Sequence, residues 1–362
     1  EIENVMSNKR LLFIPVSSPE GIGEYMRSLL LAQSLKAELT DSLDIHFILN
    51  KHTSYAKDCP FEATLLEHSA TKELDSVCDF IEQFKPDVVV FDCAGRAGHM
   101  KAAKKVGAKV IFISQHAKKR AKGLKLNRIN LIDTHWVVQS DYCIEPLTWA
   151  ESTKLDMFPL AHPRNVGPFV TFASCAQKRD VLNRYNLVPE GYFIVNAGSG
   201  GHILNNINCA DVYFKAALKI TKHTGLKAVV VFGPNYKKSI PESDEVTCLA
   251  SLQSTDFLAL MSQAKVVLLS GGDTLLQAIA VQTPVVACAI SKDQNTRLDH
   301  CVNAGVVIKA NLDIDEITTK VAQVITEPFY SEFVSKYNQL DNTHSFEVIT
   351  TGIKNMLVGD RL

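Results

Sequence analysis

The fold is decided by residues 268–278, which read Leu-Leu-Ser-Gly-Gly-Asp-Thr-Leu-Leu-Gln-Ala. An apolar run typical of a buried strand is followed by two glycines and then by a helical pattern. This order places the free N–H groups of a helix start at the carboxyl edge of a sheet, where a diphosphate accepts hydrogen bonds. The small and polar residues of this predicted ligand-binding turn are Ser270, Gly271, Gly272, Asp273, Thr274 and Gln277.

Two further turns repeat this arrangement. Residues 196–202, Asn-Ala-Gly-Ser-Gly-Gly-His, lie between an apolar run at 192–196 and a helical pattern at 211–221, and their glycines let backbone N–H groups approach an anion. Residues 293–295, Asp-Gln-Asn, follow the apolar run 284–290 and carry short polar groups suited to sugar hydroxyls. The predicted contact residues of these turns are Gly198, Ser199, Gly200, Gly201, His202, Asp293, Gln294 and Asn295. Gly233, which follows the apolar run 228–232, is predicted as a further contact.

The same order of elements runs through both halves of the chain. Short β-rich runs alternate with helical patterns, which predicts βαβ units on parallel sheets. The runs are 11–16, 43–49, 87–91, 109–114, 135–138, 192–196, 228–232, 246–249, 266–270, 284–290 and 306–309. The predicted fold class is α/β, with two Rossmann-like doubly wound parallel-sheet domains, residues 1–167 and 168–330, facing a cleft. Residues 331–362 are expected to form a C-terminal helical segment that packs back on the first domain.

The composition limits the classes of protein. A chain of 362 residues suits two domains, and 38 Lys and Arg against 39 Asp and Glu create no overall field that attracts nucleic acid. The nine cysteines include no Cys-x-x-Cys pair, which argues against a clustered zinc site and a disulfide scaffold. No apolar run approaches the roughly 20 residues that span a bilayer. We expect a soluble cytoplasmic protein with no metal site and no nucleic-acid partner.

The first predicted strand is followed by Gly21 and Gly23. A dinucleotide site would need a third glycine, where the chain has Met26, and an acid after the second strand, where it has Asn50-Lys51-His52. The pattern therefore argues against a nicotinamide or flavin site, and a plain tight turn remains the simpler interpretation.

Taken together, residues 190–310 resemble the GT-B (two-Rossmann) nucleotide-sugar glycosyltransferases. The resemblance is greatest to the group containing the transferase that adds N-acetylglucosamine to the lipid-linked muramyl peptide precursor of bacterial cell walls. That group has a Gly-Gly-Ser-x-Gly loop, a Ser-Gly-Ala-x-Thr-x-x-Glu motif with a proline after it, and an Asp-Gln loop with Asn. The matching residues are Ala197–Gly201, Ser270, Gly271, Thr274, Pro284 and Asp293–Asn295. Gln277 replaces the ribose-binding glutamate, which removes a charge-assisted hydrogen bond.

The first half resembles the same group more loosely. In the place of the group's Gly-Gly-His loop stands Gly21-Ile22-Gly23-Glu24, with Glu24 where the histidine would be. The group's Glu-Gln-Asn-Ala, Gly and Asn-Arg features are matched in part by Gln115-His116-Ala117, Gly123 and Asn127-Arg128. The acceptor-side residues that the resemblance implies are Gly21, Gly23, Arg27, Asn127 and Arg128.

The resemblance implies a glycosyltransferase. It would move a sugar from a nucleotide-diphosphate donor, a UDP-sugar, to a hydroxyl of a glycan or lipid-linked acceptor in bacterial cell-surface glycan or glycolipid synthesis. Backbone N–H groups would stabilise the leaving diphosphate without a metal, and Asp313-Ile314-Asp315 indicates the start of a helix rather than a metal-binding loop. The candidate general bases are Glu24 and His116, with His202 as a third.

Several alternatives stay open. A related UDP-sugar hydrolase of nonulosonic (pseudaminic) acid synthesis has an Ile-Gly-x-Gly-His-x-x-Arg loop, which residues 21–27 resemble. A nucleotide-sugar epimerase shares the architecture, and a catalytically impaired nucleotide-sugar-binding protein would keep the fold. Residues 116–128 hold six Lys and Arg side chains. This run is either a solvated loop or a contact with a lipid diphosphate or with the inner face of an anionic membrane.

Overall fold

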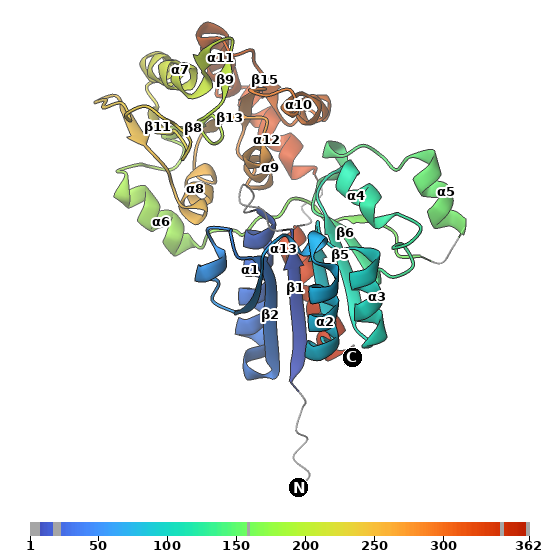
Figure 1. Ribbon diagram of the computed structural model, residues 1–362. Helices are drawn as coiled ribbons and strands as arrows, with labels where there is room; N and C mark the ends of the chain where they lie inside the picture. Colours follow the sequence, from blue (N-terminus) through green and yellow to red (C-terminus); the bar gives the residue numbers. More distant parts are fainter. Residues whose placement is uncertain (1–7, 17–22, 158–159, 341–343, 360–362) are drawn as a thin grey trace. The chain divides into compact units, whose positions relative to one another are not determined.

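The computed structural model describes residues 8–16, 23–157, 160–340 and 344–359, and the chain forms two compact units (Figure 1). Unit 1 comprises residues 1–169 and 343–362, and unit 2 comprises residues 170–342. The segment 331–362, expected as one element that packs on the first domain, is therefore divided between the units. Its first part belongs to unit 2, because helix α12 (Phe329–Asn338) packs on α11 (Ile314–Val324), whereas α13 (Ser345–Val358) packs on α1 (Gly23–Leu39) of unit 1.

Unit 1 is built on a parallel sheet of seven strands in the order β3-β2-β1-β4-β5-β6-β7. Its strands are β1 (Lys9–Pro15), β2 (Leu43–Asn50), β3 (Glu62–Leu66), β4 (Val88–Asp92), β5 (Lys109–Ser114), β6 (Thr134–Val137) and β7 (Arg164–Asn165). Besides α1 and α13, its helices are α2 (Leu74–Phe84), α3 (Ala97–Lys105), α4 (Ala117–Gly123) and α5 (Trp149–Met157).

Helices cover both faces of this sheet. Side chains alternate along β1, so that Leu11 and Phe13 pack with α1 and α13, while Leu12 and Ile14 pack with α2 and α3 on the opposite face. All four side chains have no exposed surface. Because both faces of the sheet are covered, the central strands are continuous apolar runs in the sequence, which is typical of a buried parallel sheet.

Unit 2 repeats the architecture with a parallel sheet of six strands in the order β12-β11-β8-β13-β14-β15. Its strands are β8 (Tyr192–Asn196), β11 (Lys227–Val231), β12 (Val246–Leu249), β13 (Val266–Ser270), β14 (Val285–Cys288) and β15 (Ile308–Lys309), with the antiparallel pair β9 (Ile203–Leu204) and β10 (Ile207–Asn208) outside the sheet. Besides α11 and α12, its helices are α6 (Cys175–Arg184), α7 (Cys209–Thr224), α8 (Ser254–Met261), α9 (Asp273–Ala280) and α10 (Gln294–Asn303).

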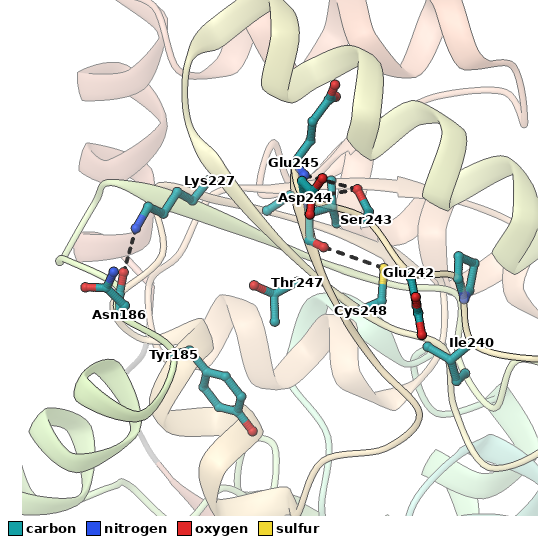
Figure 2. A pocket seen from close by; sticks show the side chains of 13 residues that line it. Tyr185, Asn186, Lys227, Ile240, Glu242, Ser243, Asp244, Glu245, Thr247 and Cys248 are labelled. Carbon is teal, nitrogen blue, oxygen red and sulfur yellow. Dashed lines mark hydrogen bonds between the residues drawn. The ribbon is translucent and has the colours of Figure 1, made fainter.

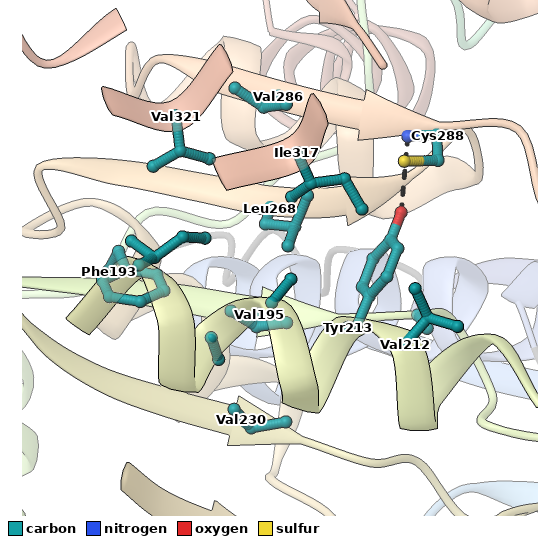
Figure 3. Packing of buried hydrophobic residues seen from close by; sticks show 14 of the residues in the cluster. Phe193, Val195, Val212, Tyr213, Val230, Leu268, Val286, Cys288, Ile317 and Val321 are labelled. Carbon is teal, nitrogen blue, oxygen red and sulfur yellow. Dashed lines mark hydrogen bonds between the residues drawn. The ribbon is translucent and has the colours of Figure 1, made fainter. Parts of the chain in front are cut away.

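One face of the unit 2 sheet packs against α7 and α11, as Figure 3 shows. Phe193 and Val195 of β8 lie in this cluster with residues of both helices. Tyr213 of α7 is fully buried, and its hydroxyl donates to the carbonyl of Leu269, 2.9 Å away, and accepts from the N–H of Cys288 at 3.3 Å. A buried hydroxyl with both partners fixes the position of α7 across β13 and β14.

The two predicted doubly wound parallel sheets are confirmed. The sequence pattern missed β3, the two-residue strand β7 and the β9–β10 hairpin. β3 is an edge strand with little buried surface, so it lacks a strong apolar pattern. The hairpin is formed by a tight turn at Asn205 and Asn206, which both have positive φ angles, and its strands are too short to show an apolar alternation.

Strand order reverses once in each sheet, and these positions locate the candidate sites. In unit 1 the reversal falls between β1 and β4, and in unit 2 between β8 and β13. Loops that leave the carboxyl ends of such neighbours diverge to opposite faces and leave room for a ligand.

Two buried histidines of unit 1 make its stability depend on pH. His135 in β6 is 2 % exposed, its Nε2 lies 2.9 Å from the Ser114 hydroxyl, and burial, followed by the charge of Arg120, lowers its pKa to about 3. Burial, followed by the charge of Arg96, likewise lowers the pKa of His99 to about 4. Both imidazoles are therefore neutral in the folded protein at neutral pH.

Because the unfolded chain binds a proton at His135 near pH 6.5, its contribution to stability is complete above that pH and is lost as the pH falls toward 3. Between pH 7 and pH 5 we expect the free energy of unfolding to fall by about 2 kcal/mol more in the wild type than in His135→Gln. Urea denaturation across this range measures the difference, and parallel curves for the two proteins would contradict the assignment.

Candidate functional site

Three predicted turns of unit 2 meet at one edge of its sheet. They follow β8, β13 and β14, which are neighbouring parallel strands, so their carboxyl ends lie together. A Cβ placed on Gly198 would lie 3.4 Å from the Ser270 hydroxyl and 3.8 Å from Ile290 Cδ1. The turn at 197–202 therefore touches both of the other turns.

Two glycines let the turn after β8 lie against the turn after β11. Gly200 has a φ of +84°, and a Cβ on it would lie 2.1 Å from the carbonyl oxygen of Phe232. Gly233 has a φ of +93°, and its Cβ would lie 2.5 Å from the backbone of Ser199. Neither position accepts a side chain, so the contact between the two turns requires glycine at both.

A residue that the sequence prediction did not assign to the site holds this turn. Asn196 ends β8 and is 7 % exposed. Its side-chain amide donates to the carbonyls of Val231 at 2.8 Å and Gly198 at 3.0 Å, and its Oδ1 accepts from the Gly198 N–H at 3.1 Å. The sequence feature that could have identified Asn196 is its position as a polar residue at the end of the apolar strand Tyr-Phe-Ile-Val-Asn.

The structure corrects the predicted roles of Gln294 and Gly271. The Oε1 of Gln294 accepts hydrogen bonds from the N–H groups of Gly271 and Ile290, both at 3.1 Å. The Gly271 N–H also lies 3.2 Å from the carbonyl of Cys288. Two groups that were predicted to contact a nucleotide are thus bonded to each other, and Gln294 holds the turns after β13 and β14 together.

Charged side chains cluster beside these turns. Arg297 of α10 forms an ion pair with Asp273 at the start of α9, with 2.8 Å between Nη1 and Oδ1. The pKa of Asp293 is lowered by the Ser291 hydroxyl, then by its own backbone N–H, and further by the charges of His202 and Arg297. The sequence prediction missed Arg297, although it follows Asp293 by one helical turn.

The other predicted residues of unit 2 lie at the same edge. A hollow of about 500 Å³ is lined by Ser199, Gly201, His202, Pro234, Asn235, Tyr236 and Lys237. Gly272 directly precedes α9, Thr274 and Gln277 are half-buried on α9, and Asn295 is exposed in the first turn of α10.

A larger pocket of unit 2 lies elsewhere (Figure 2). It has a volume of about 650 Å³ and is lined in part by Lys227 at the start of β11 and by the acidic loop 242–245 before β12. These residues lie at the amino ends of the strands, so the pocket is separate from the predicted turns.

In unit 1 the structure changes the expected role of Arg27. This residue of α1 is 5 % exposed, and its guanidinium pairs with Asp92 at the end of β4, with 2.7 Å from Nε to Oδ2 and 2.6 Å from Nη2 to Oδ1. A two-bond pair of this kind occupies the guanidinium inside the protein. Arg27 is therefore a structural residue here rather than an exposed acceptor contact, and Asp92 was not predicted from the sequence.

The remaining unit 1 candidates follow the carboxyl ends of β1 and β5. Gly23 begins α1, with Glu24 half-buried in its first turn, whereas Gly21 lies outside the described residues. His116 is exposed directly before α4. Asn127 is exposed and Arg128 half-buried a few residues after α4.

Among the described residues, no cluster of three or more His, Cys, Asp or Glu side chains is placed to hold a metal ion. No helix in the described ranges combines the length and the apolar character that a membrane span requires.

No family model and no curated protein matches the sequence. Solved structures do match over nearly the whole chain. The glycotransferase of kitacinnamycin has 14 % identity and a TM-score of 0.66, covering 96 % of this chain and 99 % of that one. UDP-GlcNAc 2-epimerase from Neisseria meningitidis, bound to UDP-GlcNAc, has 16 % identity and a TM-score of 0.64, covering 97 % and 100 %. The spinosyn forosaminyltransferase SpnP has 12 % identity and a TM-score of 0.63, covering 97 % and 100 %.

These likenesses concern the fold. The chain has the two parallel-sheet α/β domains of the GT-B glycosyltransferase structures, as the sequence resemblance predicted.

The close approach at Gly200 gives a test with a matched control. Gly225, after α7, has a similar φ of +74° but nothing within 4 Å of its Cβ position. Gly225→Ala should lower the free energy of unfolding by about 1 kcal/mol, because it adds only the strain of a left-handed backbone. Gly200→Ala adds a clash with a backbone carbonyl and should lower the free energy of unfolding by about 3 kcal/mol. Equal losses in urea denaturation would show that the two turns are not in contact.

Proposed function

We propose that the protein is a glycosyltransferase that moves a sugar from a UDP-sugar to a hydroxyl acceptor. The observation that carries the proposal is the meeting of three turns at the carboxyl ends of β8, β13 and β14, where strand order reverses. The GT-B fold, which glycosyltransferases share, supports it.

Unit 2 would bind the donor. The diphosphate would lie against the turn 198–202 and the N-terminus of α9, where N–H groups and the helix dipole favour negative charge. Arg297, already at this edge, is a second source of positive charge, because it can exchange Asp273 for a phosphate oxygen. Gln277, one turn into α9, offers an amide to the ribose diol.

The same groups would assist the reaction. As the bond between the sugar and the phosphate breaks, negative charge grows on the departing diphosphate. The turn that carries the N–H groups of residues 199–202 is already held in position by Asn196 and by the glycines, so these groups would stabilise the charge without reorganisation. We propose that this stabilisation needs no metal ion. Unit 1 would bind the acceptor and provide the general base, which is Glu24 or His116.

Donor binding is tested by calorimetric titration with UDP in the presence of EDTA. We expect UDP to bind, and Arg297→Gln to weaken the affinity about tenfold, since a charged hydrogen bond of roughly 1.4 kcal/mol is lost. The matched control is Arg179→Gln, which removes the same charge from an exposed position on α6 and should leave affinity unchanged. An absence of UDP binding, or equal affinity in all three proteins, would contradict the donor site.

The general base is tested by Glu24→Gln and His116→Gln. Removing the residue that takes the acceptor proton should lower the transfer rate at least about 100-fold, while UDP affinity stays at the wild-type value. Product formation from a panel of UDP-sugars with glycan and lipid acceptors measures the rate. If both variants transfer sugar at the wild-type rate, neither residue is the base.

A second candidate is epimerisation of a UDP-sugar. It is favoured by the similarity to the 2-epimerase bound to UDP-GlcNAc, whose TM-score and coverage are close to those of the glycosyltransferases. Incubation with UDP-sugars alone separates the reactions. An isomeric UDP-sugar indicates an epimerase, free UDP without acceptor indicates a hydrolase, and UDP released only with an acceptor indicates a transferase.

A further inference from the structure

Tyr213 of α7 contacts β13 and β14 directly before the turns that leave these strands (Figure 3). Its hydroxyl donates to the carbonyl of Leu269, 2.9 Å away, and accepts from the N–H of Cys288 at 3.3 Å. Cys288 pairs with Ser270, the last residue of β13, in the register of the two strands. The phenol therefore lies at the last rung of this parallel ladder, where the candidate donor site begins.

The hydroxyl bridges two backbone groups that belong to one rung. The N–H of Gly271 lies 3.2 Å from the carbonyl of Cys288, and in a parallel ladder this pattern places the N–H of Cys288 opposite the carbonyl of Leu269. Tyr213 has no exposed surface, and burial raises its pKa well above the usual value, so the hydroxyl stays protonated and keeps donating. Without it, the two backbone groups would have only each other as partners, and the spacing of β13 and β14 would change.

The helix that carries Tyr213 is also tied to the turn after β8. Asn208 directly precedes α7, and its Oδ1 caps the helix by accepting from the N–H of Ala210 at 2.8 Å. Its Nδ2 donates to the carbonyl of Gly200 at 3.0 Å. One helix thus contacts the turn 198–202 through Asn208 and the ends of β13 and β14 through Tyr213.

The Ser270 hydroxyl lies between the turns after β8 and β13, without a hydrogen-bond partner in the part of the chain that the structure describes. The residue is 4 % exposed. A Cβ placed on Gly198 would lie 3.4 Å from this hydroxyl, and one on Gly272 would lie 3.6 Å from it. The hydroxyl is therefore held next to the start of α9, where it can donate to an oxygen of an anionic ligand.

We infer that Tyr213 is a positioning residue of the donor site, which sets the spacing of the turns after β13 and β14 and so directs the Ser270 hydroxyl toward the diphosphate. Gln294 acts one level further along, since its Oε1 accepts from the N–H groups of Gly271 and Ile290, both at 3.1 Å. The inference rests on the proposed function only in naming the diphosphate as the group that Ser270 contacts.

A simple packing role for the phenol is the competing explanation. Tyr192, at the start of β8, provides the matched comparison, because it is also fully buried and its hydroxyl donates to the carbonyl of Leu260 in α8. Tyr192 lies at the amino end of its strand, whereas the three turns leave the carboxyl ends. Replacing either tyrosine by phenylalanine removes one buried hydroxyl, but only Tyr213→Phe does so beside the donor site.

A double-mutant cycle on UDP affinity tests the inference by calorimetric titration of the whole protein. Tyr213→Phe and Ser270→Ala should each weaken UDP binding about tenfold, because both lose the hydrogen bond from the Ser270 hydroxyl to the diphosphate. Since Tyr213 acts through Ser270, the double variant should also lose about tenfold rather than about a hundredfold. Tyr192→Phe should keep UDP affinity within about twofold of the wild type, although its stability in urea falls as it does in Tyr213→Phe.

Amide hydrogen exchange without ligand gives a readout that does not depend on UDP. Gly271 and Ile290 donate their N–H groups to Gln294 across the two turns. Tyr213→Phe should raise the exchange rates of these two groups more than Tyr192→Phe does, because only the first variant releases the strand ends beside them.

The outcomes separate this inference from the proposed function. Additive losses of UDP affinity, or equal exchange rates in the two tyrosine variants, overturn the inference. If Tyr213→Phe does not fold, Ser270→Ala still decides, because unchanged UDP affinity in that variant overturns the role of its hydroxyl. If the wild type does not bind UDP, the proposed donor site fails, and the exchange rates alone decide whether Tyr213 positions the turns.

Discussion

The candidate donor site depends on one close approach of two backbones. The turn after β8 lies against the turn after β11, and the Cβ positions of Gly200 and Gly233 are filled by main-chain atoms of the opposite turn. Asn196 then fixes the turn from within, by bonding to its N–H and carbonyl and to β11. Because these contacts are made by backbone and by a buried amide, the turn is held in place before any ligand arrives, which is the condition for stabilising charge without reorganisation.

A second link extends this rigidity across the sheet. Gln294 accepts from Gly271 after β13 and from Ile290 after β14, so one side-chain oxygen ties two neighbouring turns. Its position in the sequence suggested a sugar contact, and its geometry gives it a supporting role instead. The groups left to meet a ligand directly are then the start of α9, the turn 198–202 and the charged pair Arg297 and Asp273.

Most of the fold was predictable from the sequence, because its determinants are local. A strand that is buried on both faces is an apolar run, and a tight turn that approaches another backbone needs glycine. The supporting side chains were not predictable, since their partners are distant in the chain. Arg27 and Asp92 are 65 residues apart and Gln294 and Gly271 are 23 apart, and nothing near either residue in the sequence specifies the other.

A buried ion pair plays a comparable supporting role in unit 1, where Arg27 of α1 binds Asp92 at the end of β4. A carboxylate with no exposed surface at the end of β4 would attract the nearest guanidinium, and Arg27 satisfies it with two short bonds. The pair therefore fixes α1 against the end of β4, and its acid, Asp92, was not predicted from the sequence.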